Sequence, residues 1–141
     1  MTASMTSVQP MSMVDSSALV AILAPEHDGE IYADAVQNGS SKVTSPIVVF
    51  ETVTALCRIR KATVAQMLVI VQEFLSRADI RIQPVDADLH TAALMAFEHY
   101  GRLSQHPAQL NLGDCFSYAM AKRTDGHLIY KGNDFSQTDL A

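Results

Sequence analysis

The sequence contains few cysteines and no long apolar run. Its two cysteines, Cys57 and Cys115, are too few and too far apart for a disulfide framework or a thiol-based metal site, so we expect a protein of the reducing cytoplasm. No stretch approaches the roughly eighteen apolar residues that cross a bilayer. The first residues also lack the basic start and apolar centre of a signal peptide. We therefore expect no association with a membrane.

Basic charge is also scarce. The 141 residues include 10 Lys and Arg against 15 Asp and Glu, which gives a net charge of −5 at pH 7. A protein that binds nucleic acid through a basic surface normally has the opposite balance. The objection weakens if part of the acidic excess holds divalent cations, because these present positive charge to a phosphate.

Several common catalytic motifs are missing. None of the five histidines forms an HxH or HExxH pair, which argues against a zinc site. The chain has no GxSxG elbow, no Walker loop and no GxGxxG loop. Acyl transfer, nucleotide hydrolysis and dinucleotide binding therefore have no support from motifs.

Length and composition indicate one globular domain. Hydrophobic residues make up 48% of the chain and charged residues 18%, which is far from the composition of disordered proteins. Residues 1–10 are small and polar without periodicity, so we expect a flexible leader there. Residues 11–141 are expected to form the single domain.

Hydrophobic periodicity predicts strands that alternate with helices. The expected strands are 11–14, 42–44, 80–85 and 127–130. The expected helices are one that begins after Asp15, followed by 26–37, 47–60, 63–78, 86–100 and 114–122. This order predicts an α/β protein with a mostly parallel sheet and helices on both of its faces. In such sheets, functional residues collect at the carboxyl ends of the strands.

Four acidic residues occupy positions that could converge at this edge, although three of them also have structural interpretations. Asp15 and Asp114 stand where a carboxylate caps a helix, and Asp134 stands in a turn. Glu51 is different, because no basic residue lies one turn away on its apolar helix, and a buried carboxylate without a cationic partner is costly.

Several carboxylates in one pocket raise each other's pKa values unless a cation neutralises them. Oxygen ligands suit Mg²⁺ or Mn²⁺, which are the usual cations of phosphate chemistry. The four acids therefore predict a metal site.

Four segments resemble the PIN-domain toxins of VapC type. They are MVDSSA at residues 13–18, the Phe50–Glu51 pair, LNLGDCFSYA at 110–119 and KGNDF at 131–135. The resemblance covers residues 11–140 and implies a three-layer α/β/α sandwich of PIN type. It departs from the family pattern in the loop after Gly101, which is less glycine-rich and basic. The chain also stops soon after Asp139, so we expect a final edge strand to be short or absent.

The resemblance also implies a function. It implies the toxin of a type II toxin–antitoxin system, a Mg²⁺- or Mn²⁺-dependent ribonuclease that cuts structured RNA. Its partners would be a VapB-like antitoxin and a second copy of the chain in a homodimer. The implied metal ligands and catalytic residues are Asp15, Glu51, Asp114 and Asp134. We expect Ser16 and Thr138 to hydrogen-bond to this site.

Two other functions fit part of the sequence. A receiver-like phosphotransfer domain is also small, acidic and α/β, and Lys131 could serve as its lysine, but Glu51 would then have no role. A non-catalytic protein-binding module would use its acids as caps and the helices at 47–60 and 63–78 as a partner surface. Covalent labelling by a small phosphodonor would identify the receiver, and the absence of Mn²⁺ binding would favour the binding module.

Overall fold

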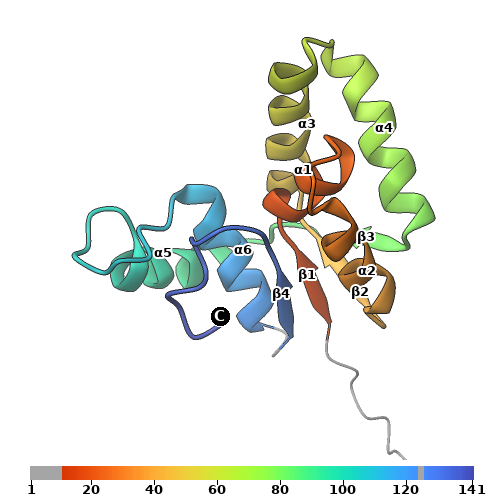
Figure 1. Ribbon diagram of the computed structural model, residues 1–141. Helices are drawn as coiled ribbons and strands as arrows, with labels where there is room; N and C mark the ends of the chain where they lie inside the picture. The colour runs from red at the N-terminus through yellow and green to blue at the C-terminus, as the bar shows by residue number, and fades with distance from the viewer. Residues whose placement is uncertain (1–10, 124–125) are drawn as a thin grey trace, which may run out of the picture.

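The computed structural model describes residues 11–123 and 126–141, so the expected leader at residues 1–10 lies outside the described residues. The described residues form four strands and six helices (Figure 1). The strands are β1 (Ser12–Val14), β2 (Lys42–Thr44), β3 (Ile80–Ile82) and β4 (His127–Ile129). The helices are α1 (Ser16–Leu23), α2 (Gly29–Asn38), α3 (Pro46–Arg60), α4 (Val64–Arg77), α5 (Leu89–Tyr100) and α6 (Leu112–Arg123).

The four strands pair in parallel in the order β3-β2-β1-β4. Met13 of β1 pairs with Val43 on one side and with Leu128 on the other. The chain therefore places β1 in the interior of the sheet, and its carboxyl end leads directly to Asp15. This arrangement confirms the expected α/β class with a small parallel sheet.

Helices cover both faces of the sheet because the chain reverses direction across it. The steps from β1 to β2 and from β2 to β3 run one way, and the return from β3 to β4 runs the other way. Right-handed crossovers then place α1 to α4 on one face and α5 and α6 on the opposite face. Figure 1 shows α6 beside β4, α5 on the other side of α6, and α3 and α4 as a hairpin that extends beyond the carboxyl ends of the strands.

Local capping explains why α3 and α4 lie where the sequence predicts them. The Ser45 hydroxyl accepts the Val48 N–H at 3.1 Å, and a proline occupies the first position of α3. The left-handed backbone of Lys61 (φ 52°) ends that helix. Thr63 and Gln66 then cap α4 reciprocally.

Three predicted boundaries are wrong by three residues each, and each error has a local reason. Helix α2 begins at Gly29 and not at residue 26, because the preceding residues form a turn that the Gly29 N–H closes onto the Glu26 carbonyl at 2.9 Å. Helix α5 begins at Leu89 and not at residue 86, because the Asp86 carboxylate caps it by accepting the Leu89 N–H. Strand β3 stops at Ile82, before the proline at position 84 that has no N–H to donate.

The hydrophobic core lies between the sheet and both helical layers. Met13, Val14, Leu19, Val43 and Leu56 are fully buried or nearly so. Within the described residues, no helix is long and apolar enough to span a bilayer. Cys57 and Cys115 are both free thiols.

Candidate active site

Asp15 lies at the carboxyl end of β1 and is almost completely buried, with 2% of its surface exposed. Its Oδ2 accepts the N–H of Ser17 at 3.1 Å and the Ser17 hydroxyl at 2.7 Å. Its Oδ1 accepts the hydroxyl of Ser117, which comes from α6, at 2.8 Å. Asp15 therefore caps α1 and is also fixed in orientation by hydroxyl donors from two helices.

Glu51 lies in the second turn of α3 and points toward α1 and α6. The Ser16 hydroxyl donates to Glu51 Oε1 at 3.2 Å. A Cβ atom added to Gly113 would lie 2.1 Å from Glu51 Oε2, so the carboxylate rests directly on the Gly113 backbone. Burial raises the pKa of Glu51, the nearby Asp15 charge raises it further, and the Ser16 hydrogen bond lowers it.

Asp114 is the third residue of α6 and is 8% exposed. Its N–H donates to Asn111 Oδ1 at 2.8 Å, and its Oδ2 accepts the Asn111 N–H at 3.1 Å. This reciprocal pair starts α6 at Leu112 and not at residue 114, which corrects the predicted boundary and makes Asn111 the capping residue.

The surroundings of Asp114 are strongly unfavourable for its negative charge. Burial is the main reason that its pKa rises to about 7. The charges of Asp134 and Asp15 and a hydrogen bond with Asp134 raise it further, against the opposing effect of the Asn111 N–H. Asp114 is thus the acid of the site that gains most from a nearby cation.

Asp134 lies on the segment that follows β4, and its side chain is exposed. The chain turns at Gly132, whose φ of 98° is in the left-handed region that glycine tolerates. The next residue after Asp134, Phe135, is 1% exposed and packs against the ring of Tyr130 with centroids 5.3 Å apart. Asp134 therefore extends toward Asp114 from a segment anchored by an aromatic side chain.

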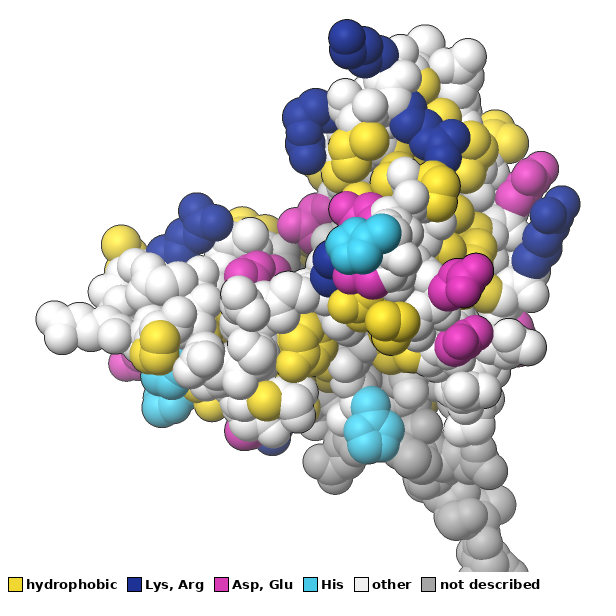
Figure 2. Space-filling view, viewed as in Figure 1, with side chains coloured by type: hydrophobic (Ala, Val, Ile, Leu, Met, Phe, Trp, Pro, Cys, Tyr) yellow, Lys and Arg dark blue, Asp and Glu magenta, His cyan; other side chains and the backbone are white. Residues whose placement is uncertain are grey.

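The structure brings the four predicted acids together through a series of neighbouring pairs. The charge of Asp15 raises the pKa of Glu51, and the charges of Asp134 and Asp15 raise the pKa of Asp114. Figure 2 shows acidic side chains near the middle of this face, between the α3–α4 hairpin and the part formed by α5 and α6. Within residues 11–123 and 126–141, no three His, Cys, Asp or Glu side chains are already arranged to hold a metal ion.

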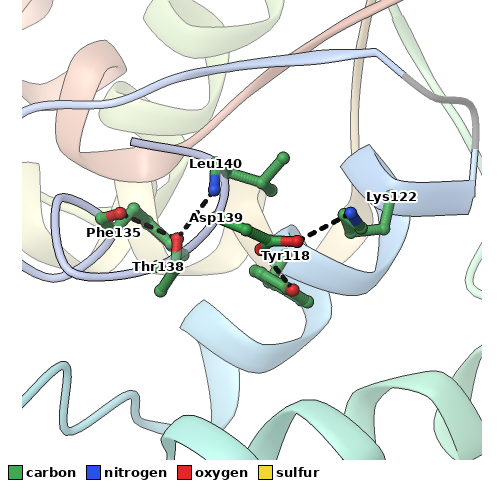
Figure 3. A network of polar contacts seen from close by, with 6 residues as sticks. All are labelled: Tyr118, Lys122, Phe135, Thr138, Asp139 and Leu140. Atoms are coloured by element: carbon green, nitrogen blue, oxygen red, sulfur yellow. Dashed lines mark hydrogen bonds and ion pairs between the residues drawn. The ribbon is translucent and has the colours of Figure 1, made fainter.

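The two hydroxyl residues expected beside the site differ in their positions. Ser16 contacts Glu51, as described above. Thr138 instead donates to the Phe135 carbonyl at 2.8 Å and accepts the Leu140 N–H at 3.1 Å (Figure 3). These two hydrogen bonds give Thr138 a role in shaping the C-terminal turns and not in contacting the acids.

Sequence reasoning missed three residues that hold the acids in place: Ser17, Ser117 and Gly113. Ser17 follows a predicted cap by two residues, which is a recognisable turn pattern. Ser117 lies one helical turn after Asp114, so it shares the same face of α6. Gly113 carries no local signal, because the need for a missing side chain comes from Glu51, 62 positions away in the sequence.

Comparisons with known proteins assign the family. A model of the PIN domain family matches residues 12–140. A VapC ribonuclease of Rhizobium meliloti is 42% identical over 141 residues, covering 92% of this chain and 99% of that protein. Ribonuclease VapC of Mycolicibacterium smegmatis is 38% identical over 130 residues, covering 92% and 97%.

A solved structure shows the same fold. The crystal structure of Mycobacterium tuberculosis VapC20, described as a sarcin-ricin loop cleaving toxin, aligns with a TM-score of 0.73 at 20% identity. The alignment covers 92% of this chain and 96% of that one. The family match and the identities favour the nuclease interpretation over both the receiver and the binding module. The chain belongs to the PIN-domain family, among its VapC ribonuclease toxins.

Proposed function

We propose that this ribonuclease toxin cuts RNA with Mg²⁺ or Mn²⁺ held by Asp15, Glu51, Asp114 and Asp134. The observation that carries the proposal is the crowding of negative charge around Asp114, whose pKa rises to about 7 beside Asp15 and Asp134. Within the described residues, the groups that shift the pKa values of Asp114 and Glu51 include no basic side chain. A divalent cation would neutralise this cluster.

The residues present fit such a cation in their chemistry. Carboxylate oxygens are the ligands that Mg²⁺ prefers, usually with several retained waters. Because no three of these side chains are already arranged around one point, the proposal requires that they adjust when a cation binds. Asp134 is the acid best able to adjust, since it is exposed while Asp15 and Asp114 are buried.

In this mechanism the protein acts mainly by holding ligand oxygens in place. Asp15, Glu51, Asp114 and Asp134 would hold the cation, which would supply positive charge to polarise a water and the scissile phosphate of the RNA. Ser17 and Ser117 fix both oxygens of Asp15, and Asn111 fixes one oxygen of Asp114. Ser16 holds Glu51 against the start of α6. These donors keep the acids oriented before any ligand arrives.

The proposed substrate is a structured RNA. The proposed protein partner is a cognate VapB-like antitoxin. The relatives named as VapC ribonucleases and the description of VapC20 as a sarcin-ricin loop cleaving toxin support both. We also propose that residues 11–141 form one domain and that the protein acts in the cytoplasm, where its two free cysteines stay reduced.

We further propose a homodimer formed through α5 and α6. Leu94 and Leu112 are 61% and 68% exposed, and they line an apolar hollow of about 360 Å³ between these helices. A large exposed apolar surface marks an interaction site, and in a twofold dimer the same patch occurs on both subunits. Light scattering should give about twice the 15.3 kDa chain mass, and a Leu94→Lys, Leu112→Lys variant should give the single-chain mass.

Digestion of total RNA with mapped cut ends tests the nuclease proposal. We expect Mn²⁺-dependent cuts that EDTA abolishes and that Asp15→Asn and Asp114→Asn variants fail to make. The matched control is Asp79→Asn, because Asp79 is exposed at the opposite edge of the sheet and its left-handed backbone suits asparagine (φ 55°). Cleavage by both site variants at the wild-type rate would refute the assignment of the site.

A further inference from the structure

Lys131 follows the end of β4 by two residues, and both its side chain and its backbone make hydrogen bonds. Its Nζ lies 2.9 Å from Glu26 Oε1 and 2.8 Å from Asp28 Oδ1, both in the turn between α1 and α2. Its backbone N–H donates to the Ser17 hydroxyl at 3.0 Å. The chain from Lys131 to Asp139, here named the Asp134 segment, is therefore attached at two points at its start.

The backbone contact leads directly to the buried acid of the site. The Ser17 hydroxyl accepts from Lys131 and donates to Asp15 Oδ2 at 2.7 Å. Any displacement of Lys131 would therefore break a hydrogen bond to the hydroxyl that orients Asp15. One residue thus links the exposed segment that carries Asp134 with the buried end of β1.

The segment needs such an anchor because of its own composition. Gly132 follows Lys131 immediately, has a φ of 98°, and would have no atom within 4 Å of an added Cβ. Asn133 and Asp134 are exposed. Phe135 anchors the far side of Asp134, so Lys131 supplies the anchor on the near side of the glycine.

The ion pairs of Lys131 with Glu26 and Asp28 also differ from the other two ion pairs in the described residues, Lys122–Asp139 and Arg123–Asp86. Lys131 and Asp28 have 27% and 20% of their side-chain surfaces exposed, whereas the Lys122–Asp139 pair has 46% and 48%. Lys131 contacts two carboxylates at once. An isolated exposed ion pair contributes little to stability, whereas a less exposed network with good geometry can fix the position of a chain segment.

We propose that Lys131 is a positioning residue for RNA cleavage, which holds the Asp134 segment in register with Asp15 through Glu26, Asp28 and Ser17. This inference rests on the proposed function, because it concerns the placement of one of the four proposed metal ligands. Lys131 itself does not contact the RNA or the cation in this account. Its loss misplaces Asp134, which weakens cation binding and slows the chemical step.

The test compares Lys131→Met, Lys131→Arg and the double variant Glu26→Gln, Asp28→Asn with the full-length wild-type chain. Calorimetry with Mn²⁺ gives cation affinity, and RNA cleavage gives kcat and KM separately. We expect Lys131→Met to raise the Mn²⁺ dissociation constant and to lower kcat, each by about tenfold, the lower end of the effect of lost supporting contacts around a metal site. KM should stay unchanged, and Lys131→Arg should restore most of both losses.

The double variant provides a second, independent check. It removes the two carboxylate charges that pair with Lys131 Nζ and leaves the lysine in place, so it should reproduce most of the loss in Mn²⁺ affinity. Adding Lys131→Met to it should then produce little further loss, as expected when two changes remove one interaction. The matched control is Arg123→Met, which removes the ion pair between Arg123 and Asp86 and should leave Mn²⁺ affinity unchanged.

The outcomes separate the two proposals. If the wild-type chain neither binds Mn²⁺ nor cuts RNA with it, the proposed metal site fails. If the wild-type chain does both and Lys131→Met and the double variant match it in Mn²⁺ affinity and kcat, only the role of Lys131 is refuted. A lower melting temperature with unchanged Mn²⁺ affinity and kcat would also refute it, since that result assigns Lys131 to stability alone.

Discussion

The two sides of the acidic site are built differently. Asp15 and Asp114 are buried at the ends of regular elements, and backbone N–H groups or hydroxyls from neighbouring elements hold their oxygens. Asp134 is exposed on an irregular segment, and Lys131 and Phe135 make the contacts that anchor this segment. The buried side is thus preorganised, while the exposed side depends on attachments at a distance. This difference predicts that damage to the buried side costs more activity.

The largest expected effect comes from removing the buried charge at the centre of the cluster. Asp114→Asn should lower kcat/KM by about 10³-fold if Asp114 is a metal ligand as proposed, because the loss of such a ligand removes several kcal/mol of transition-state stabilisation. Asp134→Asn should lower kcat/KM by a smaller factor, since water more easily replaces a proposed ligand that is exposed. Steady-state cleavage of one RNA substrate by both variants measures the difference, and equal losses would contradict the comparison of the two sides.

The next effect tests the contact between α3 and α6. Gly113→Ala places a Cβ within 2.1 Å of Glu51 Oε2, so the carboxylate or the helix must move. We expect activity to fall about 100-fold and the free energy of unfolding to fall by about 1–3 kcal/mol, as for overpacked interiors. Cleavage assays and urea denaturation measure the two effects.

Two further variants check the cause of the Gly113→Ala effect. Adding Glu51→Ala should restore stability without restoring activity, because it removes the clashing group together with a proposed ligand. Gly39→Ala is the control, since the nearest atom to its added Cβ is the flexible side chain of Lys42 at 3.0 Å. A Gly113→Ala protein with unchanged activity would mean that the close approach to Glu51 is not required.

The pH dependence of stability tests the charge state of Asp114. Its pKa is 3.8 in the unfolded reference and about 7 in the folded chain without cation, so the folded state binds the extra proton between these values. The contribution of this group to stability is therefore greatest at low pH and is lost as pH rises toward about 7. Because a cation binds the deprotonated carboxylate, the stabilisation by Mn²⁺ should grow over the same range.

Thermal unfolding with and without Mn²⁺ between pH 5 and 8 measures this linkage. The informative quantity is the difference between the wild-type chain and Asp114→Asn, since the variant lacks the titrating carboxyl of Asp114. If the stabilisation by Mn²⁺ were independent of pH in the wild-type chain, the crowding of charge around Asp114 would not be the basis of cation binding.

A smaller effect is expected from the hydroxyl that connects Asp15 with α6. Ser117→Ala leaves the buried Asp15 Oδ1 without its donor, which should cost about 1–3 kcal/mol of stability. We expect a loss of kcat of about tenfold as the carboxylate becomes free to rotate. Ser104→Ala, at a hydroxyl that donates to the Gly101 carbonyl outside the proposed site, serves as the control in both measurements. No change in kcat for Ser117→Ala would show that Ser17 alone orients Asp15.

The sequence predicted those parts of the site that have local causes. Asp15 could be found because it directly follows a short apolar strand, and Glu51 because no basic residue accompanies it on its helix. The contact of Ser117 with Asp15 joins residues 102 positions apart, and that of Lys131 with Asp28 joins residues 103 apart. Such contacts follow from the strand order and from helix packing, which periodicity alone does not determine. The misplaced helix starts had local causes that compete, since Asp86 can either begin α5 or cap it, and Asp114 and Asn111 can each cap α6.

The smallest expected effect concerns the far end of the Asp134 segment, where Asp139 binds α6 (Figure 3). Its carboxylate accepts the Tyr118 hydroxyl at 2.6 Å and lies 2.8 Å from Lys122 Nζ. Both contacts lower the pKa of Asp139, with Lys122 the larger cause, so this stabilisation is present at neutral pH and is lost as pH falls through the depressed pKa.

Because the pair with Lys122 is about half exposed, Asp139→Asn should lower the free energy of unfolding at pH 7 by only about 0.5 kcal/mol. Activity should stay near the wild-type value, since buried Phe135 lies between this contact and Asp134 and fixes the segment independently. Urea denaturation and RNA cleavage measure the two quantities. A loss of activity as large as that of Lys131→Met would mean that the whole segment moves as one unit, and that the attachment nearest the glycine has no special importance.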